Sequence, residues 1–454
     1  MNAESVSSML DESDSHEQSP VADPRELLMA SPMSHQQIIA VAVTIALCAL
    51  DGFDVLAITF AAPALLIDWG IGKVELGYVL SAGLLGMAGG SMLIAPAADV
   101  LGRRSLIFLS LVLMISGTSW SAVTNGLAEL ILSRVLTGLG IGAMIAVINP
   151  LAAEYANARR RDLTVSLLNI GYPIGGIAGG FLAAYLLTAF GWRAIFVCAA
   201  VGGIAMLFVV WRWLPEPIAY IVARPNADAL AKVNDYLNRC GIAVVAQLPP
   251  PPPGADALPV KNLFRDGMAW VTLKIMSIYF LYVTAFFYMQ TWVPVLVAGA
   301  GISPANAAIV SVCLSIGGVF GGLFIAFGTT RLGLKPIVVA AMTVGGIFII
   351  LFGWLPPSFP LFAATAAATG FFLFGGMIGL YAVVARTFPA HMRASGTGFV
   401  IGIGRLGSAL SPLLAGLLFS AGLDRAGVGE VMAVPALIAV SVLLTFRVRP
   451  PTTA

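Results

Sequence analysis

The sequence predicts an all-α membrane protein built from twelve transmembrane helices in two six-helix, pseudo-symmetric bundles. Three observations support this fold class. The 454 residues are 59% hydrophobic and only 10% charged, whereas soluble domains carry about 25% charged residues. Apolar stretches of about 20 residues, the length that crosses a bilayer as a helix, occur twelve times. Short motifs of the first half also recur in the second half.

The twelve apolar stretches form two groups of six. The first group predicts an N-terminal bundle over 36–213, and the second predicts a C-terminal bundle over 268–447. The expected helices are 36–66, 76–97, 105–123, 128–153, 163–188, 194–213, 268–297, 304–328, 336–355, 359–385, 395–420 and 430–447.

Three polar segments flank or separate these bundles. Residues 1–35 are polar and acidic, without the basic start and apolar core of a signal peptide, so we expect a disordered tail. Residues 214–267 carry five basic residues and the run Pro249–Pro253, which predicts a solvated linker with a short helix over 227–238. Residues 448–454 form a second tail.

Basic residues in the short loops predict the orientation, because cytoplasmic loops are enriched in lysine and arginine. One side of the membrane has three such residues, Lys73, Arg193 and Arg425. We therefore expect the other side, with both termini and the linker, to face the cytoplasm. It has eleven: Arg103, Arg104, Arg159, Arg160, Arg161, Arg331, Lys335, Arg386, Arg393, Arg447 and Arg449.

The two halves share repeated elements. The loop Asp99–Arg104 follows the second helix, and Thr330–Lys335 follows the eighth at an offset of 231 residues. A glycine-rich run with a proline occurs in the fifth helix at 171–176 and in the eleventh at 407–412. Two repeated halves are typical of carriers that alternate access to a site at the bilayer midplane.

Three acids, Asp51, Asp54 and Glu154, lie inside or at the edge of apolar spans. A charge at bilayer depth costs about 2.5 to 3.5 kcal/mol on insertion scales, so such residues are functional candidates. Asp51 and Asp54 share one helix face and are candidates for proton coupling. The alternative is a structural pair in which one aspartate binds Arg134. Glu154 is either a third proton carrier or part of a cytoplasmic-gate salt bridge.

Bases and aromatic residues supply the candidate substrate site. Arg134, Lys274 and Arg405 match the three acids in number. Arg405 lies near the midplane. Its two N–H donors would bind a substrate carboxylate, or its charge would pair with an acid of the other bundle. The substrate-binding candidates are Arg405, Arg134, Tyr282, Phe286 and Tyr381. Each aromatic side chain among them would either stack on a substrate ring or pack against a neighbouring helix. We expect Trp292 at the membrane interface.

Several function classes lack support in the sequence. The four cysteines are scattered, which indicates neither a metal site nor a disulfide framework. No nucleophile–base pair or nucleotide loop is present, so an enzyme is not expected, nor is a cofactor. A net charge of +2 gives no reason to expect a nucleic acid. The expected partners are a small-molecule substrate, protons and the lipid bilayer, with the protein as a monomer.

With these motifs in place, the chain resembles the major facilitator superfamily. The loop ending in Asp99–Arg104 follows that superfamily's pattern after the second helix, although Ala95 and Val100 depart from it. Arg134–Gly140 is similar to the pattern of its fourth helix. The resemblance implies the major facilitator fold, with gating roles for Asp99, Arg103 and Arg393.

Within this superfamily the chain resembles the aromatic acid:proton symporters, bacterial carriers of compounds such as 4-hydroxybenzoate, protocatechuate and benzoate. The matching runs are Asp51–Asp54 followed by Ala62-Pro63, Glu154-Tyr155 followed by Arg159–Arg161, and Arg393–Gly398 leading into Gly402–Gly407. The resemblance implies proton-driven import of an aromatic carboxylate across a bacterial inner membrane. An exporter of aromatic or amphiphilic compounds and a membrane-bound sensor remain alternatives.

Overall fold

The computed structural model describes residues 23–225, 227–249, 263–265, 268–389 and 392–446. Regular structure in these ranges is helical throughout. Twelve helices of the described chain are long and apolar enough to cross a membrane. The predicted fold class is therefore confirmed.

The first six of these spans run from α2 to α8, and short helical segments complete the second span. The bounds are α2 (His35–Trp69), α3 (Lys73–Gly89) with η1 (Gly90–Ile94) and η2 (Ala95–Ala97), α4 (Ala98–Leu101), α5 (Arg103–Val123), α6 (Leu127–Tyr155), α7 (Arg161–Ala189) and α8 (Arg193–Trp213). The last six are α11 (Met268–Ala298), α12 (Pro304–Leu332), α13 (Leu334–Trp354), α14 (Phe359–Thr387), α15 (Arg393–Ser420) and α16 (Arg425–Thr445).

The observed bounds lie close to the predicted ones, and capping explains the largest shift. The last helix begins at Arg425 rather than at residue 430. The Asp424 side chain accepts a hydrogen bond from the Gly427 N–H group at 2.8 Å. An N-cap satisfies a backbone donor that the start of a helix leaves free, so the helix begins earlier than hydropathy alone indicates.

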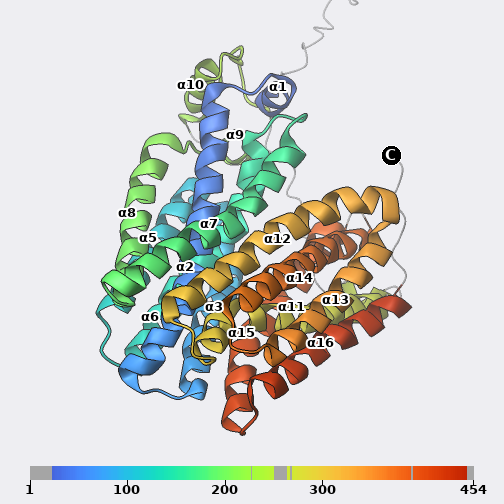
Figure 1. Cartoon of the computed structure of the whole chain (residues 1–454). Helices are drawn as coiled ribbons and strands as arrows, with labels where there is room; N and C mark the ends of the chain where they lie inside the picture. The colour runs from blue at the N-terminus through green and yellow to red at the C-terminus, as the bar shows by residue number, and fades with distance from the viewer. Residues whose placement is uncertain (1–22, 226, 250–262, 266–267, 390–391, 447–454) are drawn as a thin grey trace, which may run out of the picture.

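Helix pairing repeats between the two bundles, which lie side by side in Figure 1 (blue to green, and yellow to red). In the first bundle α2 packs on α7, α3 on α6 and α5 on α8. The corresponding pairs in the second bundle are α11 with α15, α12 with α14 and α13 with α16. Between the bundles, α3 packs on α15 and α7 on α12. Each pair has a counterpart six spans later, as two-fold pseudo-symmetry requires.

Glycines allow the closest of these pairings. A Cβ atom added to Gly175 of α7 would lie 1.8 Å from the Ala49 carbonyl oxygen of α2. In the second bundle, a Cβ atom on Gly370 of α14 would lie 1.9 Å from the Leu314 carbonyl oxygen of α12. Small residues let membrane helices approach backbone to backbone. This contact holds the first half of α2, which carries Asp51, against α7.

Three short helices mark one end of the N-terminal bundle, which we call the linker side. They are α1 (Pro24–Ala30), α9 (Ile218–Ala223) and α10 (Ala229–Arg239), and they lie at the top of Figure 1. Leu28 of α1 packs with Val222 and Leu237 in a small apolar cluster. The predicted linker helix over 227–238 corresponds to α10, whereas α9 was not predicted.

Helix α1 corrects part of the expected disordered tail. Asp23 caps it by accepting the Arg25 N–H group at 2.9 Å, and burial of Leu28 against the linker helices anchors it. The composition of the tail does not reveal this helix, because the burial of Leu28 depends on linker residues about 200 positions away in sequence. Residues 1–22 and 447–454 lie outside the described residues, as does the run Pro249–Pro253 from residue 250 onward.

Several contacts between the bundles lie at the end opposite the linker side. The Lys73 Nζ atom lies 4.0 Å from the centroid of the Phe419 ring. A Cβ atom on Gly77 would lie 3.0 Å from the Pro412 carbonyl oxygen. Trp292, which we expected at the membrane interface, is fully buried at this end with its ring centroid 5.1 Å from that of Phe419. The interface prediction was wrong because the indole packs inside the protein, against Phe419 of α15 in the same bundle.

Candidate functional site

Asp54 lies in a buried polar group assembled from three helices. Thr118 of α5 donates a hydrogen bond from its hydroxyl to Asp54 Oδ2 at 2.8 Å. Arg134 of α6 places its Nη1 atom 3.5 Å from Asp54 Oδ1 and donates from Nη2 to the Asp54 backbone carbonyl at 3.2 Å. Asp54 is 0% exposed and Arg134 is 2% exposed. The ion pair that the sequence offered as one alternative is therefore present.

Asp51, one turn earlier in α2, has different surroundings. Its carboxyl group is fully buried, and neither oxygen has a hydrogen-bond partner among the described residues. The nearby charges that act on it are those of Asp54 and of Arg405, which belongs to the other bundle. A buried charge needs a partner to offset its desolvation. Arg405 is the cation that the fold brings towards Asp51.

Arg405 of α15 borders open space. Within the described chain its side chain makes no ion pair or hydrogen bond, and it is half-buried. A Cβ atom added to Gly398 or Gly402 would meet no other atom within 4 Å. These two glycines precede Arg405 by seven and three positions, so all three lie on one helix face. The guanidinium is thus available to an anion that enters along this face.

The predicted aromatic residues differ in their availability. Tyr381 of α14 is 40% exposed, and its ring centroid lies 5.8 Å from that of Tyr279 in α11. Tyr282 is fully buried and donates its hydroxyl hydrogen to the Leu373 carbonyl at 2.9 Å. Phe286 packs inside the C-terminal bundle, with its ring centroid 4.8 Å from that of Phe374. Tyr381 is therefore the one of the three that faces open space.

Two further tyrosines belong near this region. Tyr279 contacts Tyr381 and interacts electrostatically with Arg405. Tyr172 of α7 lies near Asp51 and near Tyr381 of the opposite bundle. Tyr172 was not predicted, because its only signal in the sequence is its place in a glycine-rich run. Tyr279 is one of several aromatic residues in α11, and nothing in the sequence distinguishes it from the others.

A separate polar cluster lies on the linker side. Glu154 at the end of α6 forms an ion pair with Arg103 at the start of α5. Glu216 of the linker accepts the backbone N–H groups of Arg103 at 2.7 Å and Arg104 at 3.3 Å. Burial raises the pKa of the Glu216 carboxyl group above its ordinary value. Glu216 was not predicted, and the side chains of Asp99 and Arg393 lie outside the described residues.

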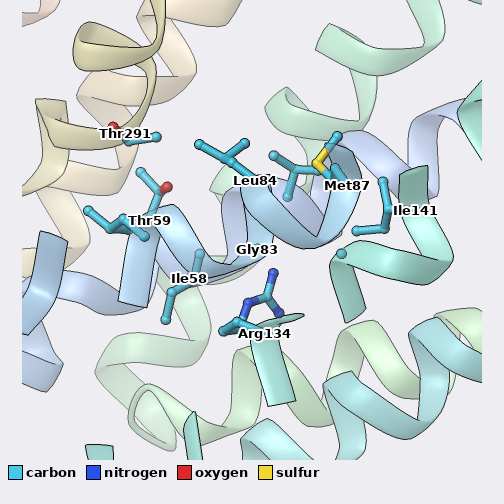
Figure 2. A pocket seen from close by; sticks show the side chains of 11 residues that line it. Ile58, Thr59, Gly83, Leu84, Met87, Arg134, Ile141 and Thr291 are labelled. Atoms are coloured by element: carbon cyan, nitrogen blue, oxygen red, sulfur yellow. The ribbon is translucent and has the colours of Figure 1, made fainter. Parts of the chain in front are cut away.

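A small cavity adjoins Arg134 at the boundary between the bundles. It measures about 20 Å³ and is lined by residues that include Thr59, Gly83 and Thr291. Figure 2 shows the guanidinium of Arg134 pointing towards Gly83 on this cavity. This volume suits a water molecule and is far below the roughly 300 to 1,000 Å³ of a ligand pocket. Arg134 is thus placed to hold Asp54 rather than a ligand.

Among the described residues, no three His, Cys, Asp or Glu side chains lie close enough together to hold a metal ion. What the arrangement offers is a half-buried cation beside open space, two buried carboxyl groups that face different partners, and phenol groups from both bundles. Such a set can bind an organic anion and exchange protons with it.

Comparison with known proteins identifies relatives along nearly the whole chain. The model of the Major Facilitator Superfamily matches residues 44–328 and 296–454. The chain is 29% identical to the gallate transporter of Pseudomonas putida, over 95% of this chain and 98% of that protein. It is 28% identical to the 4-hydroxybenzoate transporter PcaK of Acinetobacter baylyi, over 92% of each.

Another relative and a solved structure extend this picture. The chain is 27% identical to the 3-(3-hydroxy-phenyl)propionate transporter of Escherichia coli, over 89% of this chain and 94% of that protein. The xylose transporter XylE from E. coli, in a partially occluded inward-open conformation, superposes with a TM-score of 0.71 at 15% identity. That match covers 93% of this chain and 99% of XylE, and it supports the fold.

Proposed function

The chain belongs to the Major Facilitator Superfamily, and we propose that it imports an aromatic carboxylate together with protons by alternating access. The observation that carries the proposal is Arg405, a half-buried guanidinium without a partner that borders open space and acts on the buried Asp51 across the bundles. The relatives named as transporters of gallate, 4-hydroxybenzoate and 3-(3-hydroxy-phenyl)propionate support the substrate class, because all three compounds are aromatic acids.

In this proposal Arg405 binds the substrate carboxylate. A guanidinium presents two parallel N–H donors that match the two oxygens of a carboxylate. Gly398 and Gly402 leave the space that the ring needs. Tyr381 borders the ring, whereas Tyr282 and Phe286 shape the site from within the bundle.

Asp51 and Asp54 carry the protons. Asp51 relies on Arg405 for its counter-charge, so a substrate carboxylate that binds Arg405 competes with it. Asp51 then takes a proton rather than remain a buried, unpaired anion. Protonation of Asp54 likewise releases Arg134, which changes how α2 and α6 hold one another. Substrate and proton binding thereby favour each other.

The linker-side cluster supports the gate in this mechanism by holding two helices of the N-terminal bundle together. The bundles rock about the site, and the ion pair between Glu154 and Arg103 ties α6 to α5 during that motion. We assign Glu154 to this pair rather than to proton transfer, because Arg103 already binds its carboxylate. Asp99 and Arg393, in the same loop region and at the start of α15, are the further gate residues that the motifs indicate.

We further propose that the linker side faces the cytoplasm of a bacterium and that the protein works as a monomer in the inner membrane. Eleven basic residues against three support this orientation. The bundles over 36–213 and 268–447 are the two moving bodies, and the linker over 214–267 joins them on the cytoplasmic side.

Uptake into proteoliposomes tests this function directly. With a pH gradient that is acid outside, the protein should accumulate radiolabelled 4-hydroxybenzoate above its external concentration, and a protonophore should abolish the accumulation. Asp51→Asn should lose accumulation yet still exchange labelled for unlabelled substrate. Accumulation that ignores the pH gradient, or full accumulation by Asp51→Asn, would contradict proton coupling. Net movement only outward would favour an exporter.

A further inference from the structure

We propose that the phenol groups of Tyr172, Tyr279 and Tyr381 form a recognition surface for ring hydroxyls. The carrier would therefore select aromatic acids that bear a ring hydroxyl over unsubstituted benzoate. This inference rests on the proposed function, because it assumes that an aromatic carboxylate binds Arg405. We call the three side chains the phenol surface.

Two members of the phenol surface come from the C-terminal bundle and are held together. The ring centroids of Tyr279 and Tyr381 lie 5.8 Å apart. Tyr279 is 3% exposed and packs on α15 where Gly404 lacks a side chain, since a Cβ atom there would lie 2.0 Å from the Tyr279 ring. Gly404 directly precedes Arg405. The backbone of α15 therefore positions both the cation that would bind the carboxylate, Arg405, and the phenol of Tyr279.

The third member comes from the N-terminal bundle. Tyr172 of α7 lies against α2 at Gly52, where a Cβ atom would approach the Tyr172 carbonyl oxygen to 2.1 Å. Gly52 directly follows Asp51, so this contact brings Tyr172 to the turn of α2 that carries Asp51, and the phenol lies near Tyr381. Its hydroxyl donates no hydrogen bond to any described residue. The three phenols thus border the region between Asp51 and Arg405 from both bundles.

Tyr381 is the exposed member of the phenol surface. It is 40% exposed, its ring contacts that of Tyr279, and it lies near Tyr172 of the opposite bundle. Tyr282, in contrast, already donates its hydroxyl hydrogen to the Leu373 carbonyl. The side chains of Tyr279 and Tyr381 hydrogen-bond each other, so one hydroxyl hydrogen of this pair remains for a ligand near Arg405.

A surface of this kind discriminates by hydrogen bonding. Each phenol hydroxyl can donate one hydrogen bond and accept others, as can the hydroxyl of a phenolic acid. A ligand with an unsubstituted ring leaves these groups without partners in a dehydrated site, which is more costly than the hydrogen bond is favourable. Stacking alone would need only apolar aromatic residues such as phenylalanine.

Direct binding measurements on the purified full-length carrier test the inference. Dissociation constants are measured for 4-hydroxybenzoate and benzoate by titration calorimetry on the wild type and on Tyr172→Phe, Tyr279→Phe and Tyr381→Phe. Each phenylalanine variant keeps its ring and removes a hydroxyl that benzoate would leave without a partner, so benzoate affinity should not fall. Affinity for 4-hydroxybenzoate should fall about two- to tenfold for each phenol that the ligand engages, the range of one neutral hydrogen bond.

Tyr185→Phe is the matched control. Tyr185 lies on α7 like Tyr172, but it is 63% exposed and its ring contacts Phe190 instead of the site. It should leave both dissociation constants unchanged. Thermal unfolding of every variant checks that the fold is intact.

The outcomes separate the two proposals. If the wild type binds both acids and none of the three variants changes their affinity ratio, the phenol surface is refuted while the proposed function stands. If the wild type binds neither acid nor any hydroxylated benzoate, the proposed function fails and this inference fails with it. A loss of selectivity in at least one variant, but not in Tyr185→Phe, supports the phenol surface.

Discussion

The Nη1 atom of Arg134 lies 3.5 Å from the Oδ1 atom of Asp54, and the two side chains are 2% and 0% exposed. A buried ion pair loses most stability when only one partner is removed, because an uncompensated charge remains, at a cost of about 3 to 5 kcal/mol. The pair therefore couples stability to proton binding, because protonation of Asp54 leaves the buried guanidinium of Arg134 without its counter-charge.

Removing one partner should cost more than removing both. We expect Arg134→Ala to lower the free energy of unfolding by about 3 to 5 kcal/mol, and Asp54→Asn to abolish gradient-driven uptake. The double variant Asp54→Asn/Arg134→Gln should regain part of the stability lost on removing the arginine alone, but no uptake. Thermal unfolding and vesicle uptake measure the two effects. Full gradient-driven accumulation by Asp54→Asn would remove this aspartate from the coupling mechanism.

Arg405 should be irreplaceable by another cation. Arg405→Lys keeps the charge but loses the two-donor geometry. We expect the affinity for 4-hydroxybenzoate to fall about tenfold or more, because a hydrogen bond to a charged group contributes about 1.5 to 3 kcal/mol. Titration calorimetry measures it, with Arg193→Lys, half exposed and paired with Asp68, as the control. An unchanged dissociation constant would exclude direct contact with the carboxylate.

Glu216 should stabilise the start of α5 through its acceptor oxygens. Its carboxyl group accepts the N–H groups of Arg103 and Arg104, as a helix N-cap does. We expect Glu216→Ala to destabilise the protein by about 0.5 to 2 kcal/mol and Glu216→Gln, which keeps an acceptor, to cost less. Thermal unfolding compares the two. Equal losses for both variants would show that the charge rather than the cap matters.

Asp23 should make the docking of α1 depend on pH. The hydrogen bond from the Arg25 side chain holds the pKa of Asp23 below its ordinary value. A carboxyl group whose pKa falls on folding stabilises the folded form fully above its unfolded pKa, about 3.9. That contribution is lost as the pH falls through the lower folded value.

Limited proteolysis near α1 measures this effect. Asp23→Ala should speed cleavage at neutral pH, and the difference from the wild type should shrink as the pH falls below about 4. A difference that is constant across this pH range would mean that the ionised carboxylate does not hold the helix.

Gly175 should not accept a side chain. A Cβ atom there would lie 1.8 Å from the Ala49 carbonyl oxygen, so α7 must move away from α2. We expect Gly175→Ala to lower the free energy of unfolding by about 1 to 3 kcal/mol, as overpacking does, and to slow transport. Gly126→Ala, where no atom lies within 4 Å of the added carbon, should do neither. Equal stability of the two variants would contradict the tight pairing.

The membrane spans and the two aspartates were predictable because their signals are local. Each span must be about 20 apolar residues long to cross a bilayer, and a charge within such a span is conspicuous. The residues Asp51 and Asp54 of α2 were recognised in this way. Helix α16 begins earlier than hydropathy predicts, because a single hydrogen bond to the Asp424 side chain caps its start.

Pairing between distant segments was not predictable in the same way. The sequence named no partner for a salt bridge of Glu154, and its ion pair is with Arg103, 51 positions earlier. Trp292 was expected at the interface, and the chain buries it against Phe419. Helix α1 was missed because its anchor, Leu28, needs linker residues to cover it.

The amino-acid sequence alone determined that the chain crosses a membrane in two repeated groups of six helices, and it named the carboxyl groups inside the first helix. Tertiary structure decided that Asp54 pairs with Arg134, that Arg405 of the other bundle is the cation near Asp51, and that the rings of Tyr279 and Tyr381 meet. The physical reason is that hydropathy depends on neighbouring residues along one helix, whereas partners of buried polar groups depend on which helices the glycine-lined contacts bring together.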